Sequence, residues 1–245
     1  MSFLKSLKSD ESIQNESDNL GGGGLLESNA YLLEIKLAYI TTADSGAVAL
    51  NIRANTEDGK EVRQQFYMTS GTAKGCKNYY EDRNGEKKYL PGFLTANSLA
   101  LLTTGKEISD QDTEEKVVAL WSNTAKAEVP TKVPMLMDML GKQVIAGILK
   151  QTVDKTKKND QTGEYEPTGE TRDENEIDKL FQASTRRTTA EIRAGAETGV
   201  FIDSWKAKWE GKVKNKTKGN NGSGAKAGAP KPAATSTKPT SSLFG

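Results

Sequence analysis

Three successive segments between residues 30 and 69 alternate apolar and polar side chains, and this pattern constrains the fold more than any other feature of the chain. Residues two apart in a strand share a face, so the alternation predicts three half-buried antiparallel strands. The segments are separated by Asp44-Ser45-Gly46 and Glu57-Asp58-Gly59, residue types that suit tight hairpins. The predicted core face holds Tyr31, Leu33, Ile35, Leu37 and Tyr39, then Val48, Leu50, Ile52 and Ala54, then Val62, Phe66 and Met68.

The opposite face of these strands is polar and basic and includes one aromatic ring. Two interpretations stay open at this point. The face is either an ordinary solvated surface or, because cations lie beside an aromatic ring, a surface suited to nucleic acid. Its members are Lys36, Asn51, Arg53, Arg63, Gln65 and Tyr67.

A second group of cations and tyrosines follows within residues 71–89. Asn84-Gly85 is a strong turn signal, so residues 77–82 and 86–90 are predicted to pair as a hairpin. Interleaved cations and rings suit phosphate neutralisation combined with base stacking; the alternative is a solvated hairpin whose tyrosines pack on the sheet. The residues concerned are Lys74, Lys77, Tyr79, Tyr80, Arg83, Lys87, Lys88 and Tyr89.

The middle of the chain combines helical and extended signals. A helix is predicted over residues 96–104, capped by Thr95 or Asn97 and ended by Gly105, and a short acidic helix over 109–116. Residues 117–121 form an apolar run whose type, strand or helix, periodicity does not decide, and Trp121 is predicted to lie in the core. Pro130 and Pro134 indicate an extended piece, and residues 135–140 are predicted to form one or two helical turns that end at Gly141.

The last third is predicted to hold two more strands and further helices. Residues 143–153, which include Lys150, are apolar on both faces and predict a central strand, followed by a loop with Lys155, Lys157 and Lys158. Residues 164–171 predict an edge strand because of Pro167. A helix is predicted over 173–183 from the spacing of Ile177, Leu180 and Phe181, then a turn at 188–193 and a final helix docked through Phe201, Trp205 and Trp209.

Composition excludes several classes of function. The chain has no histidine and a single cysteine, Cys76, which excludes an ordinary zinc site, a histidine-based catalytic centre and an intramolecular disulfide. It has no phosphate-binding loop or dinucleotide motif. We therefore expect a non-enzymatic protein without cofactor, metal or small-molecule substrate. No apolar run approaches the roughly 20 residues of a membrane span and no secretory signal is evident, so we expect a cytoplasmic protein.

The two ends differ from the middle. Residues 1–29, with four glycines at 21–24, predict a flexible N-terminal arm, residues 30–210 one folded domain, and residues 211–245 a disordered tail. All 33 acidic residues lie at or before Glu210, whereas seven lysines and no acid follow it. The body, with 27 basic residues, therefore has a net negative charge. The concentrated positive charge of the tail predicts that it is an interaction segment. The tail ends in Leu243-Phe244-Gly245, interpreted either as a docking tip for a protein partner or as a neutral chain end.

The order of these elements predicts a fold. Three meander strands, a helical insertion and a strand pair give a mainly β chain arranged as a five-stranded OB-fold-like barrel, followed by C-terminal helices. The binding face of an OB fold lies on its second and third strands and the adjacent loops. Arg53, Arg63, Tyr67 and the 74–89 loop occupy those places here.

A resemblance to a known family adds to this prediction. Over residues 25–210 the chain resembles phage single-stranded DNA-binding proteins of small lytic podoviruses. The resemblance is carried by Leu26-Glu27, Tyr31 with Ile35, Gly46 through Arg53, Gly75, Tyr80 and Gly85, Pro91-Gly92-Phe93, Pro134, Leu140-Gly141-Lys142, Asn175-Glu176-Ile177-Asp178 and Phe181. It implies an OB fold that coats single strands in replication and recombination without sequence preference. It also implies a tail whose terminal aromatic docks replication or transcription proteins; Phe244 matches, but the family's acidic residues before it are replaced by lysines.

The sequence therefore predicts a single-stranded DNA-binding protein. The predicted contacts are Lys36, Arg53, Arg63, Lys74, Lys77, Arg83, Lys87, Lys88, Lys150 and Lys155 for phosphates, Tyr67, Tyr79, Tyr80 and Tyr89 for bases, and Leu243 and Phe244 for a protein partner. Lys157 and Lys158 extend the groove. Three alternatives stay open: a virion or assembly scaffold protein, a single-stranded RNA-binding protein with the same chemistry, and an enzyme, which would require a site that no motif indicates.

Overall fold

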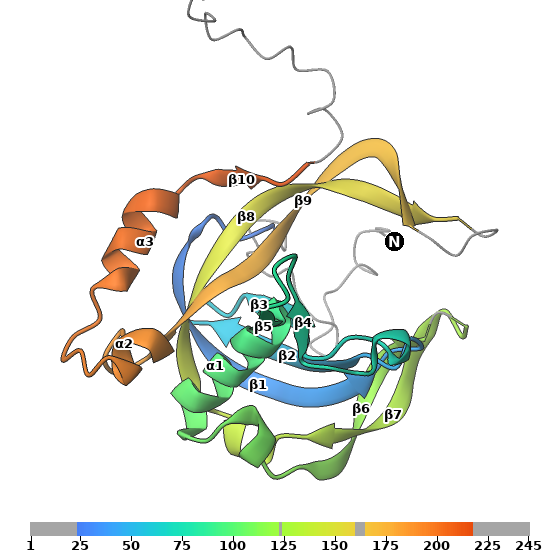
Figure 1. Ribbon diagram of the computed structural model, residues 1–245, viewed down its shortest axis with the longest axis horizontal. Helices are drawn as coiled ribbons and strands as arrows, with labels where there is room; N and C mark the ends of the chain where they lie inside the picture. The colour runs from blue at the N-terminus through green and yellow to red at the C-terminus, as the bar shows by residue number, and fades with distance from the viewer. Residues whose placement is uncertain (1–23, 123, 160–164, 218–245) are drawn as a thin grey trace, which may run out of the picture.

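The computed structural model describes residues 24–122, 124–159 and 165–217, and this part of the chain is mainly β (Figure 1). The first three predicted strands are confirmed as β1 (Asn29–Thr42), β2 (Val48–Thr56) and β3 (Glu61–Tyr67), which pair antiparallel in sequence order. Gly46 and Gly59 both adopt φ of 79° in the two turns. Glycine takes this left-handed conformation without steric cost, so the turns form where the sequence predicts them.

A bulge in β1 changes which side chains reach the core. Ile35 pairs with Ala54 whereas Leu37 pairs with Arg53, so Lys36 is the extra residue. Beyond it, Ala38 joins Leu33 and Ile35 in the main core, while Leu37 faces a second, smaller apolar cluster around Tyr39 and Met135. The prediction that Leu37 and Tyr39 share the face of Leu33 is therefore wrong, because one inserted residue reverses the alternation.

The rest of the main sheet extends from β1. β8 pairs with the N-terminal half of β1 on one side and with β9 on the other, and β10 runs parallel to β8. β7 joins β1 at the Tyr39–Met135 pair and pairs with β6. Figure 1 shows the β8–β9 pair as a long ribbon that extends past the body of the sheet. These strands are β6 (Glu114–Ser122), β7 (Ala127–Met135), β8 (Gln143–Lys158), β9 (Tyr165–Gln182) and β10 (Val213–Asn215).

Helix α1 (Pro91–Thr104) packs Ala96, Leu99 and Leu102 into the main core with apolar side chains of β1, β2, β3, β8 and β9. It begins five residues earlier than predicted, with Pro91 at its first position and Leu90 as its N-terminal cap. Proline suits this position because it has no N–H to leave unsatisfied, so neither Thr95 nor Asn97 acts as the cap. Gly105 ends the helix at φ of 77°, as predicted.

The region after α1 is more extended than the sequence predicted. Residues 109–116 do not form a helix; a single 3-10 turn at Ile108–Asp110 precedes β6. The undecided run at 117–121 belongs to β6, and Pro130 and Pro134 lie in β7, an extended piece as predicted. Only a 3-10 turn, Met137–Met139, forms within residues 135–140.

The predicted helix over residues 173–183 is wrong, because β9 continues through this stretch. Ile148 pairs with Ile177 and Gly147 with Lys179, so Asp178 is a bulged extra residue. The bulge places Ile177 and Leu180 on the same core-facing side three residues apart, a spacing that imitates a helix. The strands predicted at 143–153 and 164–171 are confirmed but are longer, so Lys155, Lys157 and Lys158 lie on β8 and not on a loop.

The C-terminal helices form as predicted around an aromatic anchor. Thr188 caps α2 (Thr189–Arg193), and α3 (Phe201–Trp209) docks on the sheet. Trp205 is buried, and its indole Nε1 donates a hydrogen bond of 2.8 Å to Asp178. Gly147 of β8 faces this ring so closely that a Cβ there would lie 2.9 Å from it.

The folded part extends beyond the expected boundaries at 29/30 and 210/211. Leu26 is buried and bonded to Asn175, and the Ser28 carbonyl accepts a 2.9 Å hydrogen bond from the Gly211 N–H. Lys214 of β10 forms an ion pair of 3.6 Å with Asp178, and Lys216, just after β10, forms one of 2.5 Å with Glu176. Residues 1–23 and 218–245, with the predicted tip Leu243-Phe244, lie outside the described residues. In the described part of the chain, no helix is long and apolar enough to cross a membrane.

Candidate nucleic-acid interface

The side chains of β2 and β3 that point away from the core form one polar row, here named the front face. Cross-strand pairing places Arg53 opposite Arg63, Asn51 opposite Gln65, and Ala49 opposite Tyr67. The Gln65 amide Nε2 donates to the Asn51 amide oxygen over 2.9 Å. The Tyr67 ring is 48% exposed. The predicted association of Arg53, Arg63 and Tyr67 on one surface is therefore found in the structure.

The two front-face arginines differ in how they are held. Arg63 forms an ion pair of 2.8 Å with Glu61, and the hydrogen bond from this pair raises the pKa of the Arg63 guanidinium. Arg53 has no carboxylate partner among the described residues; its Nη2 donates to the Ala119 carbonyl of β6 over 3.4 Å. Exposed ion pairs of this kind are worth little free energy, so a phosphate group can replace Glu61 at small cost.

The 71–89 segment is fastened to the β1–β2 turn. The Thr72 N–H donates to the Ser45 carbonyl over 2.7 Å, the Ser70 N–H to the Lys77 carbonyl over 2.8 Å, and the Leu90 N–H to the Asn78 carbonyl over 2.9 Å. Beyond this base, β4 (Tyr79–Glu81) and β5 (Lys87–Tyr89) form the predicted hairpin. Because its base is fixed, the segment presents its cations and rings from a defined position beside the end of β3.

The hairpin turn is held by one carboxylate. Asp82 accepts a 2.5 Å hydrogen bond from the Lys88 ammonium and backbone hydrogen bonds from Asn84 and Glu86. These bonds, that of Lys88 first, lower the pKa of the Asp82 carboxyl. Lys88 therefore supports the turn, and its positive charge is partly neutralised by the Asp82 carboxylate.

The four predicted stacking tyrosines do not share one surface. Tyr79 pairs with Tyr89 across the hairpin, whereas Tyr80 pairs with Lys88 and so faces the other side. The Tyr79 ring lies between Lys77, 5.5 Å from its centroid, and Lys87 at 5.1 Å. Tyr89 packs against Phe93 at 5.0 Å between ring centroids. Tyr89 is still 54% exposed, but among the described residues Tyr67 and Tyr80, 48% and 46% exposed, have neither a ring contact nor a cation over the ring, so they are the rings best placed to accept a base.

Ion pairing divides the predicted cations into two groups. Five of them face carboxylates: Lys36 with Glu34, Arg63 with Glu61, Lys88 with Asp82, Lys150 with Glu27 and Lys155 with Glu170. The other five have no ion pair within the described residues, and four of these lie in the 71–89 segment. This unpaired set is Arg53, Lys74, Lys77, Arg83 and Lys87.

Three predicted contacts lie apart from the front face. Lys36 is the bulged residue of β1, and its ammonium is 2.6 Å from Glu34. Lys150 is on β8, two strands from Arg53 in the sheet, and its ammonium lies 2.7 Å from Glu27, which raises its pKa. Lys155 is on the β8–β9 ribbon, opposite Glu170. The structure does not bring these lysines together with the unpaired set.

Trp121, predicted in the core, is 62% exposed on β6. Val118 and Leu120 of the same strand face the Tyr39 cluster, and alternation directs Trp121 to the opposite side. The correct position follows from the period of β6 once the strand is recognised, but the sequence alone left strand and helix undecided. The indole therefore lies on the outer side of the β6–β7 hairpin and does not extend the front face.

A cleft separates β3 from β9 and continues the front face inward. Its volume is about 700 Å³, and it is lined by Gln64, Gln65, Phe66, Tyr67, Ser70, Lys74, Leu90, Gly92, Thr95, Glu176 and Ile177, among others. One hydrogen bond crosses the gap, from the Ile177 N–H to the Gln64 amide oxygen over 3.3 Å. A second hollow, of about 470 Å³, lies on the other side of this bond between Arg63 and Asn175.

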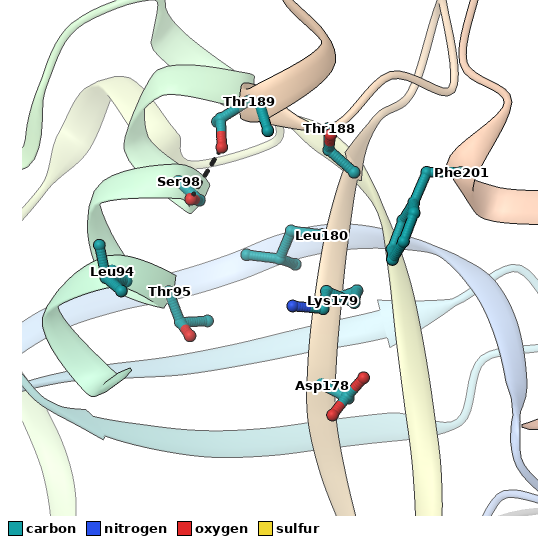
Figure 2. Close-up of a pocket in the computed structure, with 10 residues that line it drawn as sticks. Leu94, Thr95, Ser98, Asp178, Lys179, Leu180, Thr188, Thr189 and Phe201 are labelled. Carbon is teal, nitrogen blue, oxygen red and sulfur yellow. Dashed lines mark hydrogen bonds between the residues drawn. The ribbon is translucent and has the colours of Figure 1, made fainter. Parts of the chain in front are cut away.

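A smaller hollow of about 260 Å³ lies between α1, β9 and the two C-terminal helices, and Figure 2 shows its lining. Ser98 of α1 and Thr189 of α2 are joined there by a hydroxyl contact of 3.2 Å. The hollow falls below the usual size of small-molecule sites, roughly 300–1,000 Å³. Its Asp178 carboxylate is already bonded to Trp205 and lies near Lys214, so the hollow has the features of a packing gap.

The described residues contain no group of three or more His, Cys, Asp or Glu side chains that could hold a metal ion. No protein-family model matches the sequence. No curated protein matches it significantly.

Proposed function

We propose that this protein is an OB-fold single-stranded DNA-binding protein that coats single strands without sequence preference. The observation that carries the proposal is that Arg53 and Tyr67 lie on the second and third strands of the sheet, and that the unpaired cations of the 71–89 segment follow directly after the third strand, with Lys74 beside Tyr67. This is the location at which OB folds bind single strands.

The strand order supports the OB-fold part of the proposal. β1, β2, β3, β8 and β9 occur in the order β3-β2-β1-β8-β9 within the sheet, and α1 stands between the third and fourth of them. The two hairpins, β4–β5 and β6–β7, are insertions in the connection between the third strand and the fourth. A five-stranded, partly open barrel with these connections is the OB arrangement, and the β3–β9 cleft is its open seam.

The proposed chemistry combines charge neutralisation and stacking. Arg53, Lys74, Lys77, Arg83 and Lys87 contact phosphates, together with Arg63 once Glu61 is displaced. Tyr67 and Tyr80 each stack one base, a contact worth about 1–3 kcal/mol. Every base has a face that a tyrosine ring can cover, so this mode of binding tolerates any sequence.

We further propose the cellular role that the family resemblance implies: coating of single strands during phage DNA replication and recombination in the host cytoplasm. Docking of a replication protein by Leu243 and Phe244 belongs to the same proposal. Of the lysines expected in a basic tail, Lys214 and Lys216 pair with acidic residues of β9. These two lysines therefore stabilise the folded body, and any tail contact with DNA would begin after them.

The test is fluorescence anisotropy of labelled oligo-dT with the full-length protein, competed by unlabelled oligo-dT, duplex DNA and single-stranded RNA. The proposal predicts efficient competition by oligo-dT and weak competition by duplex. Equal competition by RNA would identify a general single-strand binder. Absence of binding at low salt, together with large DNA-free assemblies by light scattering, would overturn the proposal in favour of an assembly protein.

A further inference from the structure

The edge of β3 that faces the cleft offers hydrogen-bonding groups that the protein leaves open. The Met68 N–H donates to the Val48 carbonyl over 2.8 Å, and bonded pairs recur at every second residue of an antiparallel ladder. The main-chain groups of Phe66 and Gln64 therefore point to β2, and those of Gln65 and Tyr67 point away from it. Among the described residues, β3 pairs with no strand on that side.

The cleft is kept open by its surroundings. A Cβ on Gly92, at the start of α1, would lie 2.2 Å from the Tyr67 carbonyl oxygen, so the helix covers the Tyr67 main chain as closely as glycine permits and bounds the cleft at that end, leaving Gln65 as the open part of the edge. On the far side, Gln64 already binds the Ile177 N–H and holds β9 away from a direct backbone pairing. The result is a fixed space next to an exposed strand edge, and not a collapsed seam.

The charges around the cleft suit a nucleotide. Lys74, one of the unpaired cations, lines the cleft together with the exposed Tyr67 ring, so the cleft and the front face share two residues. Glu176 is the carboxylate of the lining, and Lys216 lies 2.5 Å from it, which offsets its repulsion of a phosphate. The volume of about 700 Å³ lies within the range of small-molecule sites, roughly 300–1,000 Å³.

We infer that the β3–β9 cleft receives one unstacked nucleobase of the bound single strand. This inference rests on the proposed function and deepens it. The base enters beside Tyr67, its polar edge bonds the open main-chain N–H and carbonyl of Gln65, and Lys74 contacts the adjoining phosphate. Each nucleobase carries neighbouring hydrogen-bond donors or acceptors, so a strand edge that offers both an N–H and a carbonyl accepts more than one base.

The first test uses the full-length protein and oligo-dT with 4-thiothymidine at defined positions, which crosslinks to neighbouring residues on irradiation. Trypsin separates the candidate sites: residues 64–74 contain the β3 edge, residues 173–179 contain Glu176 and Ile177, and residues 78–83 contain Tyr79 and Tyr80 of the hairpin. A base in the cleft lies between β3 and β9, so we expect crosslinks to both 64–74 and 173–179. Crosslinks confined to 64–74 and 78–83 would overturn the inference and leave the proposed function intact.

The second test fills the cleft. Thr95 of α1 lines the cleft and the small hollow of Figure 2, whereas the neighbouring Leu94 lines only the hollow. Thr95→Phe is expected to weaken oligo-dT binding about tenfold, the effect of losing one held base, with an unchanged salt slope. Leu94→Phe is the matched control and is expected to leave affinity unchanged.

The unfolding midpoint of each variant, measured alongside, shows that it is folded at the assay temperature. Unchanged oligo-dT affinity in a folded Thr95→Phe variant would overturn the inference. Binding of an extended peptide strand in the cleft, in place of a base, would overturn it too. If the unsubstituted protein does not bind oligo-dT, the proposed function is overturned as well.

Discussion

The Gln64 amide oxygen accepts a hydrogen bond of 3.3 Å from the Ile177 N–H and thereby joins β3 to β9 across an open seam. Gln64 is the residue that interrupts the apolar alternation of its strand, between the buried Val62 and Phe66. A polar side chain at a core-facing position is explained by this bond, because the outward N–H of a strand edge needs an acceptor.

Gln64→Ala is expected to lower the free energy of unfolding by about 1 kcal/mol, the usual net value of one hydrogen bond. Urea unfolding followed by circular dichroism measures it. Gln65→Ala is the control, since that exposed side chain bonds only Asn51 and such changes usually fall within about 0.5 kcal/mol. Equal losses in the two variants would show that the bridge has no special role.

Removal of an unpaired cation should reduce the salt dependence of binding. Lys77→Ala is expected to make the slope of log K against log salt shallower by about 0.7, the contribution of one phosphate contact to a single strand. Anisotropy titrations of oligo-dT at several salt concentrations give this slope. Lys106→Ala serves as control because Lys106 lies 3.2 Å from Asp138 beyond the end of α1; a similar change in that variant would point to a general charge effect.

An exposed ring on the interface should matter more than an exposed ring elsewhere. Tyr80→Ala is expected to weaken oligo-dT binding by about 1–3 kcal/mol if its ring stacks a base. Tyr165 on the β8–β9 ribbon is 69% exposed and lies outside the proposed interface, so Tyr165→Ala should bind as the unsubstituted protein does. The reverse order of effects, measured by the same titration, would move the binding surface to the ribbon.

Glu191 connects the two C-terminal helices and gives the fold a pH-dependent element. Burial alone would raise the pKa of the Glu191 carboxyl, but backbone hydrogen bonds from Thr188, Phe201 and Val200 outweigh it and lower that pKa. The stabilisation is therefore fully present above the usual pKa of 4.5 and is lost as the pH falls through the lower folded-state value.

Glu191→Ala is expected to lower the free energy of unfolding at pH 7 by about 1 kcal/mol, as for loss of a helix cap. The difference from the unsubstituted protein should shrink when urea unfolding is repeated at progressively more acidic pH. Glu197→Ala changes an exposed residue in the same connection and should have little effect on the free energy of unfolding at pH 7 or at acidic pH. A Glu191→Ala deficit that stays constant into acid would contradict the capping account.

The sequence predicts the elements whose period is undisturbed. β2 and β3 follow their alternation throughout, and β1 follows it as far as its bulge at Lys36, because these stretches bury one face without an inserted residue. Helix α1 likewise ends at its predicted glycine. A bulge breaks the period of two on which this prediction depends. Asp178 turns the spacing of two between core residues of β9 into a spacing of three, which is also a helical spacing, and only the pairing with β8 distinguishes the two.

The sequence predicts one part of the candidate site correctly and misplaces another. Residue types and strand period place Arg53, Arg63 and Tyr67 on one face. The ion pairs that occupy Lys36, Lys150 and Lys155 depend on tertiary contacts with Glu34, Glu27 and Glu170, respectively. The β3–β9 cleft likewise depends on the absence of a backbone pairing between two strands more than 100 residues apart, which no local pattern encodes.

The salt dependence of oligo-dT affinity tests the central claim most directly. If the five unpaired cations, Arg53, Lys74, Lys77, Arg83 and Lys87, each neutralise one phosphate, log K should fall against log salt with a slope of about −3.5, or of about −4.2 when Arg63 adds a sixth contact. Anisotropy of the full-length protein with labelled oligo-dT over a range of salt concentrations measures it. A slope near zero, or no binding at the lowest salt, would contradict the proposal that this surface binds single-stranded nucleic acid.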